Sequence, residues 1–382
     1  MKNILYIHAG AEMYGADKIL LETVEGINKE EFTPIVVLPT DGILRKKLEQ
    51  NDIETHVIDY PILRRKYFNV KGIINYVRSY RKKSQDIVNL LEDKKIDIIH
   101  ANTTAVLEGI YLKYKLHAKL IWHVHEIITT PKFMNVIISF LLGRFADEII
   151  TVSKAVKSNL VKTHLVSSDK ITVLYNGISN VDLKSVKTDY LYKEFNISNK
   201  NKIIGMIGRI NAWKGQEDYI KAVAPILKDN RDVHAFVVGG VFNGEEWRKD
   251  NLKKIIDKTE VSGQIHLVDF RNDAVHLLKM FDLFVLPSTR PDPFPTVVLE
   301  AMSVGKAVVA YKHGGVLEMI EEKESGLFAN VNEVDDLSKK ISLLIEDDVL
   351  LEKMGKSALN RQRNLFNKKQ FIQNMEKIYL GE

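Results

Sequence analysis

The sequence of 382 residues contains no cysteine. This absence excludes disulfide bonds, cysteine nucleophiles and cysteine-ligated zinc, and it suits a reducing compartment. Long apolar runs are also missing, because the longest, from Val136 to Leu142, falls well short of the ~20 residues that a membrane-spanning helix needs. The apolar run after Met1 is too short for a signal peptide. The sequence therefore predicts a cytoplasmic protein that is neither secreted nor membrane-spanning.

Motifs for a metal or a nicotinamide cofactor are missing as well. No Asp-x-Asp pair occurs in the chain. His123 and His125, followed by Glu126, resemble part of a metal site, but the spacing suggests no third ligand, so we predict none. The glycine-bearing segment 8–18 is not G-x-G-x-x-G, and no acidic residue ends the second predicted strand. A nicotinamide dehydrogenase is therefore disfavoured.

Composition and length indicate a soluble protein of two domains. Hydrophobic residues make up 45% and charged residues 27% of the chain, which excludes overall disorder. Domains usually have about 100–200 residues, so two are expected. Residues 64–83 hold eight basic residues, four aromatic ones and no acidic one. This segment suits an anionic membrane surface on the inner face of the membrane or the phosphates of a substrate; a simple solvated helix is the alternative.

Short β-branched apolar runs alternate with longer amphipathic segments along the chain. Such runs are typical of parallel strands that are buried on both faces. They predict an α/β fold of two doubly wound, Rossmann-like domains. The predicted strands are 3–8, 35–38, 55–58, 98–101, 120–124, 148–152, 171–174, 203–207, 234–238, 265–268, 283–286, 307–310 and 327–329.

A polar stretch from Ser179 to Asn201 separates the two series of strands and indicates an interdomain linker. The boundaries that follow are 1–178 for the first domain and 179–365 for the second. The last segment, 367–380, has one apolar helical face and should dock on another part of the protein. Its apolar residues are Phe371, Ile372, Met375, Ile378 and Tyr379.

Ligands of open parallel sheets bind beyond the carboxyl ends of the strands, so the residues there are the candidates for a site. In the first domain, Gly10 and Gly15 flank a turn that leads into a helix, which allows a close approach of ligand to backbone. After the fifth strand, His125 is placed to contact a substrate hydroxyl or a developing charge. A tight turn and a structural histidine are the alternatives.

In the second domain, Gly208-Arg209 follows the first strand and Lys214 comes five residues later, at the start of a helix. An arginine and a lysine in this arrangement predict a clamp for a diphosphate.

The proline-rich segment 287–302 is the most informative part of the sequence. A helix is predicted to begin near Pro295, and its first N–H groups, those of Thr296, Val297 and Val298, predict an anion site. Asp292 and Glu300 flank this site and suit the hydroxyls of a sugar and a ribose.

At these residues the sequence resembles the retaining GT-B glycosyltransferases of family 4, also called glycosyl transferases group 1. The resemblance covers essentially the whole chain. It is carried by segments 15–18, 125–126, 176–178, 208–215 and 292–300. The family motif is Glu, seven residues, Glu; here the first acid is Asp292, which is one methylene shorter. The Asp-Pro-Phe-Pro version looks most like bacterial polysaccharide enzymes, rhamnosyltransferases among them.

The resemblance implies two domains that face a central cleft, with a final helix, 366–382, that crosses back to the first domain. It implies metal-independent transfer from a UDP-, dTDP- or GDP-sugar to a saccharide or lipid-linked acceptor, with retention and with no cofactor or nucleic acid. The implied catalytic residues are His125, Arg209, Lys214, Asp292 and Glu300. The implied donor-binding residues are Gly15, Gly208, Arg209, Lys214, Phe270, Arg271, Asp292, Phe294, Thr296, Val297, Val298 and Glu300. The implied acceptor-binding residues are Gly10, Glu12, Tyr14, His125 and Glu126.

Two other classes share some of these features. A sugar-nucleotide epimerase or a phosphorylase would use the same phosphate site, although phosphorylases need a pyridoxal lysine and have longer chains. A non-enzymatic, hinge-closing sugar-binding protein would usually be exported. Release of nucleoside diphosphate from a sugar nucleotide separates the classes.

Overall fold

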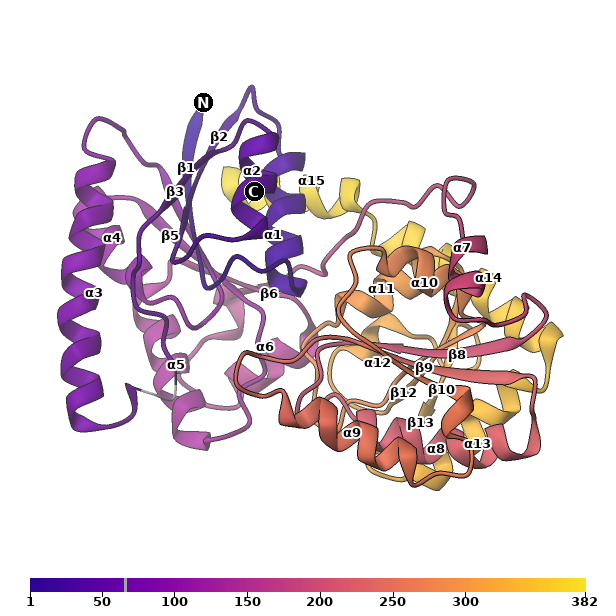
Figure 1. The fold of residues 1–382 in the computed structure, drawn as a ribbon. Coiled ribbons are helices and arrows are strands. Elements are labelled where there is room, and N and C mark those ends of the chain that lie inside the picture. Colours follow the sequence, from indigo (N-terminus) through magenta and orange to yellow (C-terminus); the bar gives the residue numbers. More distant parts are fainter. Residues whose placement is uncertain (65–66) are drawn as a thin grey trace. The chain divides into compact units, whose positions relative to one another are not determined.

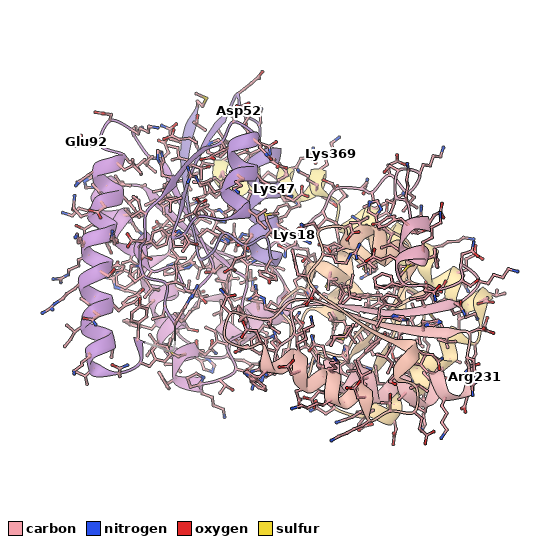
Figure 2. The ribbon with its side chains drawn as sticks, viewed as in Figure 1. Lys18, Lys47, Asp52, Glu92, Arg231 and Lys369 are labelled. Carbon is pink, nitrogen blue, oxygen red and sulfur yellow. The ribbon has the colours of Figure 1, made fainter. Side chains whose placement is uncertain are left out.

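The structure, a computed structural model, describes residues 1–64 and 67–382. Arg65 and Lys66 of the basic segment 64–83 lie outside the described residues. The chain forms two compact units. Unit 1 consists of Met1–Gly177 and Lys368–Glu382, and unit 2 consists of Ile178–Asn367. Charged side chains such as Glu92 of unit 1 and Arg231 of unit 2 point outward from their own unit (Figure 2).

Unit 1 is built on a parallel sheet that, over the described residues, has seven strands in the order β3-β2-β1-β4-β5-β6-β7 (Figure 1). The strands are β1 (Lys2–His8), β2 (Phe32–Leu38), β3 (Glu54–Val57), β4 (Ile98–Asn102), β5 (Lys119–Val124), β6 (Glu148–Thr151) and β7 (Ile171–Val173). The helices are α1 (Gly15–Gly26), α2 (Ile43–Gln50), α3 (Val70–Leu90), α4 (Glu108–Leu116), α5 (Lys132–Phe145), α6 (Lys154–Val161) and α15 (Lys368–Leu380). The direction of strand order reverses between β1 and β4.

Unit 2 repeats this plan with six parallel strands among its described residues, in the order β10-β9-β8-β11-β12-β13. The strands are β8 (Lys202–Ile207), β9 (Val233–Val238), β10 (Ile265–Val268), β11 (Leu283–Leu286), β12 (Ala307–Tyr311) and β13 (Gly326–Ala329). The helices are α7 (Asp189–Glu194), α8 (Gln216–Asp229), α9 (Trp247–Asp257), α10 (Ala274–Met280), α11 (Thr296–Ser303), α12 (Val316–Met319), α13 (Val334–Ile345) and α14 (Asp348–Leu365). Here the order reverses between β8 and β11.

Every strand that the apolar runs predicted is present, so the doubly wound α/β fold is confirmed. The remaining differences are at strand ends. β1 and β8 begin one residue earlier than predicted, at Lys2 and Lys202, which are polar and only partly buried. Apolar periodicity misses such residues because they join the backbone ladder without burying a hydrophobic side chain.

The prediction of a linker between Ser179 and Asn201 was wrong, because this segment packs on unit 2. It contains α7, whose Leu191 is fully buried, and Val186 is 7% exposed. Lys279 Nζ donates to the carbonyl oxygens of Leu183 and Val186 at 2.6 and 2.7 Å. A few apolar anchors and a lysine therefore hold a largely polar sequence in place.

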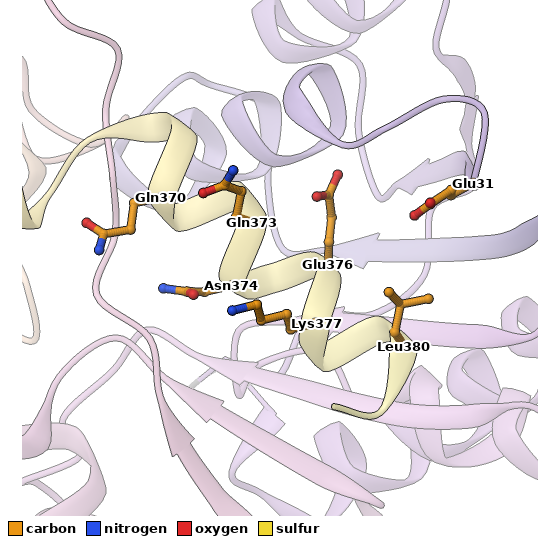
Figure 3. Close-up of a pocket in the computed structure, with 7 residues that line it drawn as sticks. All are labelled: Glu31, Gln370, Gln373, Asn374, Glu376, Lys377 and Leu380. Atoms are coloured by element: carbon orange, nitrogen blue, oxygen red, sulfur yellow. The ribbon is translucent and has the colours of Figure 1, made fainter.

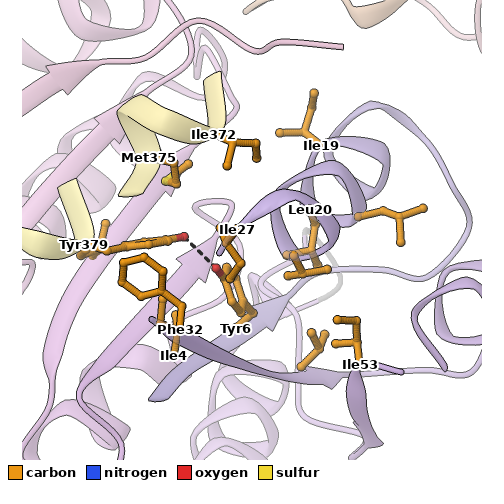
Figure 4. Packing of buried hydrophobic residues seen from close by; sticks show 14 of the residues in the cluster. Ile4, Tyr6, Ile19, Leu20, Ile27, Phe32, Ile53, Ile372, Met375 and Tyr379 are labelled. Atoms are coloured by element: carbon orange, nitrogen blue, oxygen red, sulfur yellow. Dashed lines mark hydrogen bonds between the residues drawn. The ribbon is translucent and has the colours of Figure 1, made fainter. Parts of the chain in front are cut away.

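The prediction that the last helix docks through one apolar face is confirmed by α15, which belongs to unit 1. Its five predicted apolar side chains are buried in the core of this unit (Figure 4). The Tyr379 hydroxyl forms hydrogen bonds with the Tyr6 hydroxyl at 2.9 Å and with His100 Nδ1 at 2.8 Å. A larger residue at Gly26 would force the Ile372 side chain to move, since a Cβ atom there would lie 2.7 Å from Ile372 Cγ1. Like the other helices that the structure describes, α15 is not long and apolar enough to cross a membrane.

Candidate active site

The candidate residues of each unit gather at the point where its strand order reverses. In unit 1, His8 ends β1 and lies opposite Asn102, which ends β4; Asn102 in turn pairs with His123 of β5. In unit 2, Gly208-Arg209 follows β8, and the segment with Asp292 follows the neighbouring β11. The reversal leaves a crevice at the carboxyl ends of the strands, which is where ligands of such sheets bind.

In unit 1, a chain of hydrogen bonds leads from a buried carboxylate to His125. Asp17 Oδ1 lies 2.5 Å from His8 Nε2. His8 Nδ1 lies 2.8 Å from Asn102 Nδ2, and Asn102 Oδ1 lies 2.6 Å from His125 Nε2. Asp17, His8 and Asn102 are at most 5% exposed, whereas His125 is partly exposed. The chain therefore holds one accessible imidazole in a fixed orientation.

The carboxylate at one end sets the direction of every hydrogen bond in this chain. Burial alone would raise the pKa of Asp17, but the hydrogen bond from His8, together with those from backbone N–H groups, outweighs it and lowers that pKa. Asp17 is thus an acceptor, so His8 Nε2 donates to it, Asn102 Nδ2 donates to His8 Nδ1, and His125 Nε2 donates to Asn102 Oδ1. Nδ1 is then the acceptor nitrogen of His125.

His125 is a neutral imidazole over the physiological pH range. Burial and the neighbouring His8 and His100 lower its pKa to about 3. Burial likewise lowers the pKa of His123, whose ring centroid lies 4.1 Å from that of His125. His123 is only 1% exposed, so it supports His125 from behind. Within residues 1–64 and 67–382, no group of three or more His, Asp or Glu side chains could hold a metal ion.

The backbone next to this series of hydrogen bonds is strained at one residue and is held in place by further hydrogen bonds. Thr103 has φ 90°, which a β-branched residue adopts only at a cost of about 1–3 kcal/mol. Its N–H donates to the His123 carbonyl at 2.9 Å, and its own carbonyl accepts from Trp122 Nε1 at 2.8 Å. Glu126 Oε2 accepts the N–H groups of Thr104 and His125, both at 3.1 Å. Glu126 therefore orders the ends of β4 and β5, while its own pKa is raised by burial.

The predicted acceptor residues of the first turn lie next to Asp17. Tyr14 precedes α1 and donates its N–H to Asp17 Oδ2 at 2.8 Å, and Gly15 is the first residue of this helix. Gly10 is close enough that a Cβ atom there would lie 3.6 Å from Asp17 Oδ1. Glu12 is exposed on the same turn.

In unit 2, the structure brings together Lys214 and Asp292, which are far apart in sequence. Lys214 Nζ lies 2.8 Å from Asp292 Oδ2, and the Ser288 hydroxyl donates to the same oxygen at 2.6 Å. The side chains of Lys214 and Asp292 are 15% and 12% exposed. An ammonium carries three N–H donors, so one ion pair leaves capacity for phosphate oxygens.

The loop that carries Lys214 depends on two special conformations. Asn211 Oδ1 accepts the N–H groups of Trp213 and Lys214, both at 3.0 Å. Gly215 has φ 78°, and a Cβ atom there would lie 1.8 Å from the Pro287 carbonyl oxygen, so only glycine fits. The Asn211 hydrogen bonds and the conformation of Gly215 together place the start of α8 against the segment after β11.

The segment with Asp292 is braced from β12. His313 Nε2 donates to the Ser288 carbonyl at 2.5 Å, and the Gly315 N–H donates to the Asp292 carbonyl at 2.7 Å. A Cβ atom on Gly314 would lie 2.5 Å from the same carbonyl oxygen. The four prolines of segment 287–302 therefore act together with a second loop, 313–315, which no sequence motif predicted.

Arg209 is placed by an aromatic ring. Its guanidinium lies 3.8 Å from the ring centroid of Phe242. Its carbonyl accepts from Gln216 Nε2 at 3.0 Å, which links it to α8. Gly208 packs near Lys214, since a Cβ atom there would lie 3.8 Å from Lys214 Cδ. Arg209 and Lys214 therefore lie on one loop, between β8 and α8, and contacts with both of its ends hold them.

The predicted anion site at α11 offers fewer N–H groups to a ligand than expected. The helix begins at Thr296 after Pro295, as predicted. The prediction that Val298 offers a free N–H group was wrong, because this group donates to the Pro295 carbonyl at 3.0 Å. The tight first turn thus leaves the N–H groups of Thr296 and Val297 for a ligand. Glu300 lies one turn further along α11 and is partly exposed.

Three other predicted donor residues have different surroundings. Phe270 follows β10 and is 45% exposed, as a base-stacking residue would be. Arg271 forms bonds to Asp273, at 2.7 and 2.8 Å, and to Glu194, and these partners raise its pKa. Phe294 is only 4% exposed, and its ring packs against Phe366 with centroids 5.6 Å apart. The Phe294 side chain therefore anchors the loop in the core of unit 2.

Each unit has a pocket. The pocket of unit 1 lies away from the candidate residues, and that of unit 2 lies beside the loop that carries Lys214. A pocket of about 470 Å³ lies between Glu31 and the outer face of α15 (Figure 3). Glu31 precedes β2, so this pocket is at the amino end of the strands, opposite the histidine chain. In unit 2, a pocket of about 320 Å³ borders Asn211 and Gly215. Its lining includes Glu217 and Asp218 of α8 and Arg248 of α9.

Comparison with known proteins gives a consistent result over both units. The model of the glycosyltransferase family 4 matches residues 14–180, and that of glycosyl transferases group 1 matches residues 189–361. A Campylobacter jejuni N,N'-diacetylbacillosaminyl-diphospho-undecaprenol alpha-1,3-N-acetylgalactosaminyltransferase is 27% identical over 369 residues, which cover 92% of this chain and 91% of that protein. An Escherichia coli UDP-Gal:alpha-D-GlcNAc-diphosphoundecaprenol alpha-1,3-galactosyltransferase is 24% identical, with 96% and 93% coverage.

A solved structure extends this result to the fold. Anabaena HepE, in complex with UDP and glucose, has a TM-score of 0.85 and 25% identity, and the match covers 100% of both chains. The two family models together span nearly the whole chain, and the two parallel sheets are those of the GT-B fold. The chain therefore belongs to glycosyltransferase family 4, and it is a glycosyltransferase with the GT-B fold.

Proposed function

We propose that this enzyme transfers a sugar from a nucleotide-activated donor to a lipid-linked saccharide, without a metal ion, in bacterial polysaccharide assembly. The observation that carries the proposal is the group formed by Lys214, Asp292 and the start of α11, which combines a fixed cation, a carboxylate and free helix N–H groups. This combination suits the diphosphate and the sugar hydroxyls of a nucleotide sugar.

Unit 2 is the proposed donor unit. Lys214, Arg209 and the N–H groups of Thr296 and Val297 would bind the diphosphate, and Glu300 would accept a hydrogen bond from a ribose hydroxyl. As the bond from the sugar to the diphosphate breaks, negative charge grows on the phosphate oxygen. A fixed cation and helix N–H groups stabilise that charge more than they stabilise the intact donor, which is what lowers a barrier.

A UDP-sugar is the preferred donor in this proposal, because Anabaena HepE was solved with UDP and glucose and a UDP-galactose transferase is among the relatives. Exposed Phe270 would stack on the base. Asp292 is one methylene shorter than the usual glutamate of the family motif, so the sugar preference is expected to differ from that of family members with glutamate. dTDP-rhamnose therefore belongs in the donor panel.

Retention of anomeric configuration is part of the proposal. UDP-galactose carries its sugar in the α configuration, and the E. coli and C. jejuni relatives are both named as alpha-1,3 transferases. An α product from an α donor is retention. His125 is the proposed catalytic residue of unit 1, where its imidazole is a neutral hydrogen-bonding group rather than an acid.

Activity is expected to survive removal of divalent metal ions, because protein groups neutralise the diphosphate. The assay measures nucleoside diphosphate released from UDP-, dTDP- and GDP-sugars with a polyprenyl-diphosphate-linked saccharide, with and without excess EDTA. The proposal is supported if one donor releases its nucleoside diphosphate only when the acceptor is present, and at equal rates with and without EDTA. A complete loss that only Mg²⁺ or Mn²⁺ restores would contradict the metal-independent mechanism.

A further inference from the structure

The pocket of about 320 Å³ in unit 2 is lined by the first turns of α8 and α9, which follow β8 and β9. We name it the Trp247 pocket, after the aromatic residue that opens α9. Among the described residues, none that lines it belongs to the proposed donor site. Its volume is at the lower end of the range of about 300–1,000 Å³ for small-molecule sites, so it suits a single ring. It is therefore a candidate for a second binding site.

An exposed aromatic ring forms part of the lining. The Trp247 side chain is 56% exposed, although it is large and apolar. The Arg248 guanidinium lies 4.4 Å from the centroid of this ring, and Arg248 Nε donates to Glu245 Oε2 at 2.7 Å, so the ring is held from one side. Ile210 and Leu252 add buried apolar side chains. A fixed and accessible aromatic ring is a platform for another flat, apolar face.

Hydrogen-bonding groups accompany this ring. Asn251 Nδ2 donates to Glu217 Oε1 at 3.2 Å, which joins α9 to α8 in the lining of the pocket. Asp218 Oδ2 accepts from the Tyr311 hydroxyl at 2.9 Å, which fixes the second carboxylate. An ionised carboxylate has about four acceptor positions, so each of these two keeps capacity for the hydroxyl groups of a ligand.

The charges of the lining favour a neutral ligand. Glu217 and Asp218 are negative, and Arg248 is the one positive residue among the described residues that line the pocket. Its charge is already paired with Glu245. Two carboxylates repel an anionic ligand but accept hydrogen bonds from neutral hydroxyl groups. A sugar ring combines an apolar C–H face with hydroxyl groups at its edge, and this is the chemistry that the Trp247 pocket complements.

We propose that the Trp247 pocket binds one neutral sugar residue, stacked on Trp247 and hydrogen-bonded to Glu217 and Asp218, that is not the sugar being transferred. The proposal rests on the proposed function for the source of this residue, which is a non-reacting sugar of the saccharide acceptor. The binding itself needs neither donor nor turnover. Unit 2 would then help to select the acceptor as well as bind the donor.

The binding test is saturation-transfer NMR of the full-length protein with the methyl glycosides of galactose, N-acetylgalactosamine and rhamnose, without donor or lipid. We expect saturable transfer to one of these glycosides, with a Kd on the order of 1 mM, the range for a ligand of about a dozen non-hydrogen atoms. Excess UDP should leave the signal unchanged, because the proposed diphosphate-binding residues do not line the pocket.

Variants locate the bound sugar. Trp247→Ala should weaken binding by about tenfold or more, the effect of removing an aromatic anchor. Glu217→Ala should weaken it by about fivefold through the loss of a hydrogen bond. The matched controls are Tyr114→Ala on α4, a side chain that is 55% exposed, and Glu352→Ala on α14, which breaks an exposed ion pair with Lys356. Neither control should change binding, and thermal melting should stay unchanged in all four variants.

Kinetics connect the pocket to the acceptor. Trp247→Ala should raise the KM for a polyprenyl-diphosphate-linked trisaccharide by about tenfold, a change of about 1.4 kcal/mol, while kcat and the donor KM stay unchanged. The KM for an acceptor with a single sugar should not change, because that sugar is the reacting one. An equal rise in KM for both acceptors would contradict a site for a non-reacting sugar.

The absence of saturation transfer to every glycoside of the panel would overturn the inference. So would a signal that Trp247→Ala leaves unchanged, because the sugar would then bind elsewhere. A signal that excess UDP abolishes would place the sugar in the donor site and would overturn it as well. Failure of the proposed function shows differently, as glycoside binding without release of nucleoside diphosphate from any sugar nucleotide.

Discussion

Replacing Lys214 with methionine should lower kcat by roughly 10²–10³-fold, the effect seen when one preorganised stabiliser of developing charge is removed. Lys214 is held by the Asn211 turn, by Gly215 and by Asp292. Its ammonium group therefore needs no rearrangement when negative charge develops on the leaving phosphate. Methionine keeps the length of the side chain but removes the charge. Because the charge matters most in the transition state, kcat should fall more than donor affinity.

The control addresses the partner of Lys214. Lys214→Met leaves the Asp292 carboxylate with Ser288 alone, and an unpaired, largely buried charge destabilises a protein by about 3–5 kcal/mol. Combining it with Asp292→Asn should restore much of the melting temperature without restoring turnover. Lys228→Met, which breaks the exposed ion pair with Glu260, serves as the matched variant and should keep full activity. Normal turnover of Lys214→Met would exclude it from the catalytic machinery.

Asn102→Leu should reduce kcat by about 100-fold, the loss that follows when an oriented catalytic group is misplaced by about 1 Å. Leucine has a similar volume but breaks the chain that fixes His125 through Asp17 and His8. His8 and His125 then lose a partner in a buried site, so a loss of stability of about 1–3 kcal/mol is also expected. His125→Ala should cause a loss in kcat at least as large.

A second substitution at this position distinguishes orientation from general damage. Asn102→Asp can accept from both imidazoles, so it should raise the pKa of His125 from about 3 and add an acid limb to the pH–rate profile. The wild type should show no loss of activity from His125 protonation between pH 5 and 8, because a group with a pKa this low stays neutral there. Thr23→Val, a buried polar substitution on α1, is the control for stability. Identical pH profiles for Asn102→Asp and wild type would contradict the role of the chain.

Sequence patterns predicted most of the fold because its determinants are local. Continuous apolar runs located every strand, and the spacing from Phe371 to Tyr379 predicted the buried face of α15. The segment 179–201 was misassigned because its polar composition hides the few residues that hold it on unit 2. The burial of Leu191 depends on neighbours that are distant in sequence. So does the hydrogen bond from Lys279 to the carbonyl oxygen of Leu183 in this segment.

The candidate site was predictable only in part, for the same reason. His125, Lys214 and Asp292 stood out because each follows a strand in a distinctive motif. His8, Asn102 and Asp17 were missed, although His8 and Asn102 also end strands; the signal was their position on the two strands that flank the reversal of strand order. The ion pair of Lys214 with Asp292 and the brace from His313 arise only when β8, β11 and β12 lie side by side.

Retaining transfer from a nucleotide sugar can be checked by the anomeric configuration of the product. The measurement is proton NMR of the saccharide made from an α-configured UDP-sugar and a polyprenyl-diphosphate-linked acceptor, recorded with the amount of UDP released. We expect one UDP per new glycosidic bond and an α linkage throughout the reaction. A β linkage, or UDP release without a new bond to the acceptor, would contradict it.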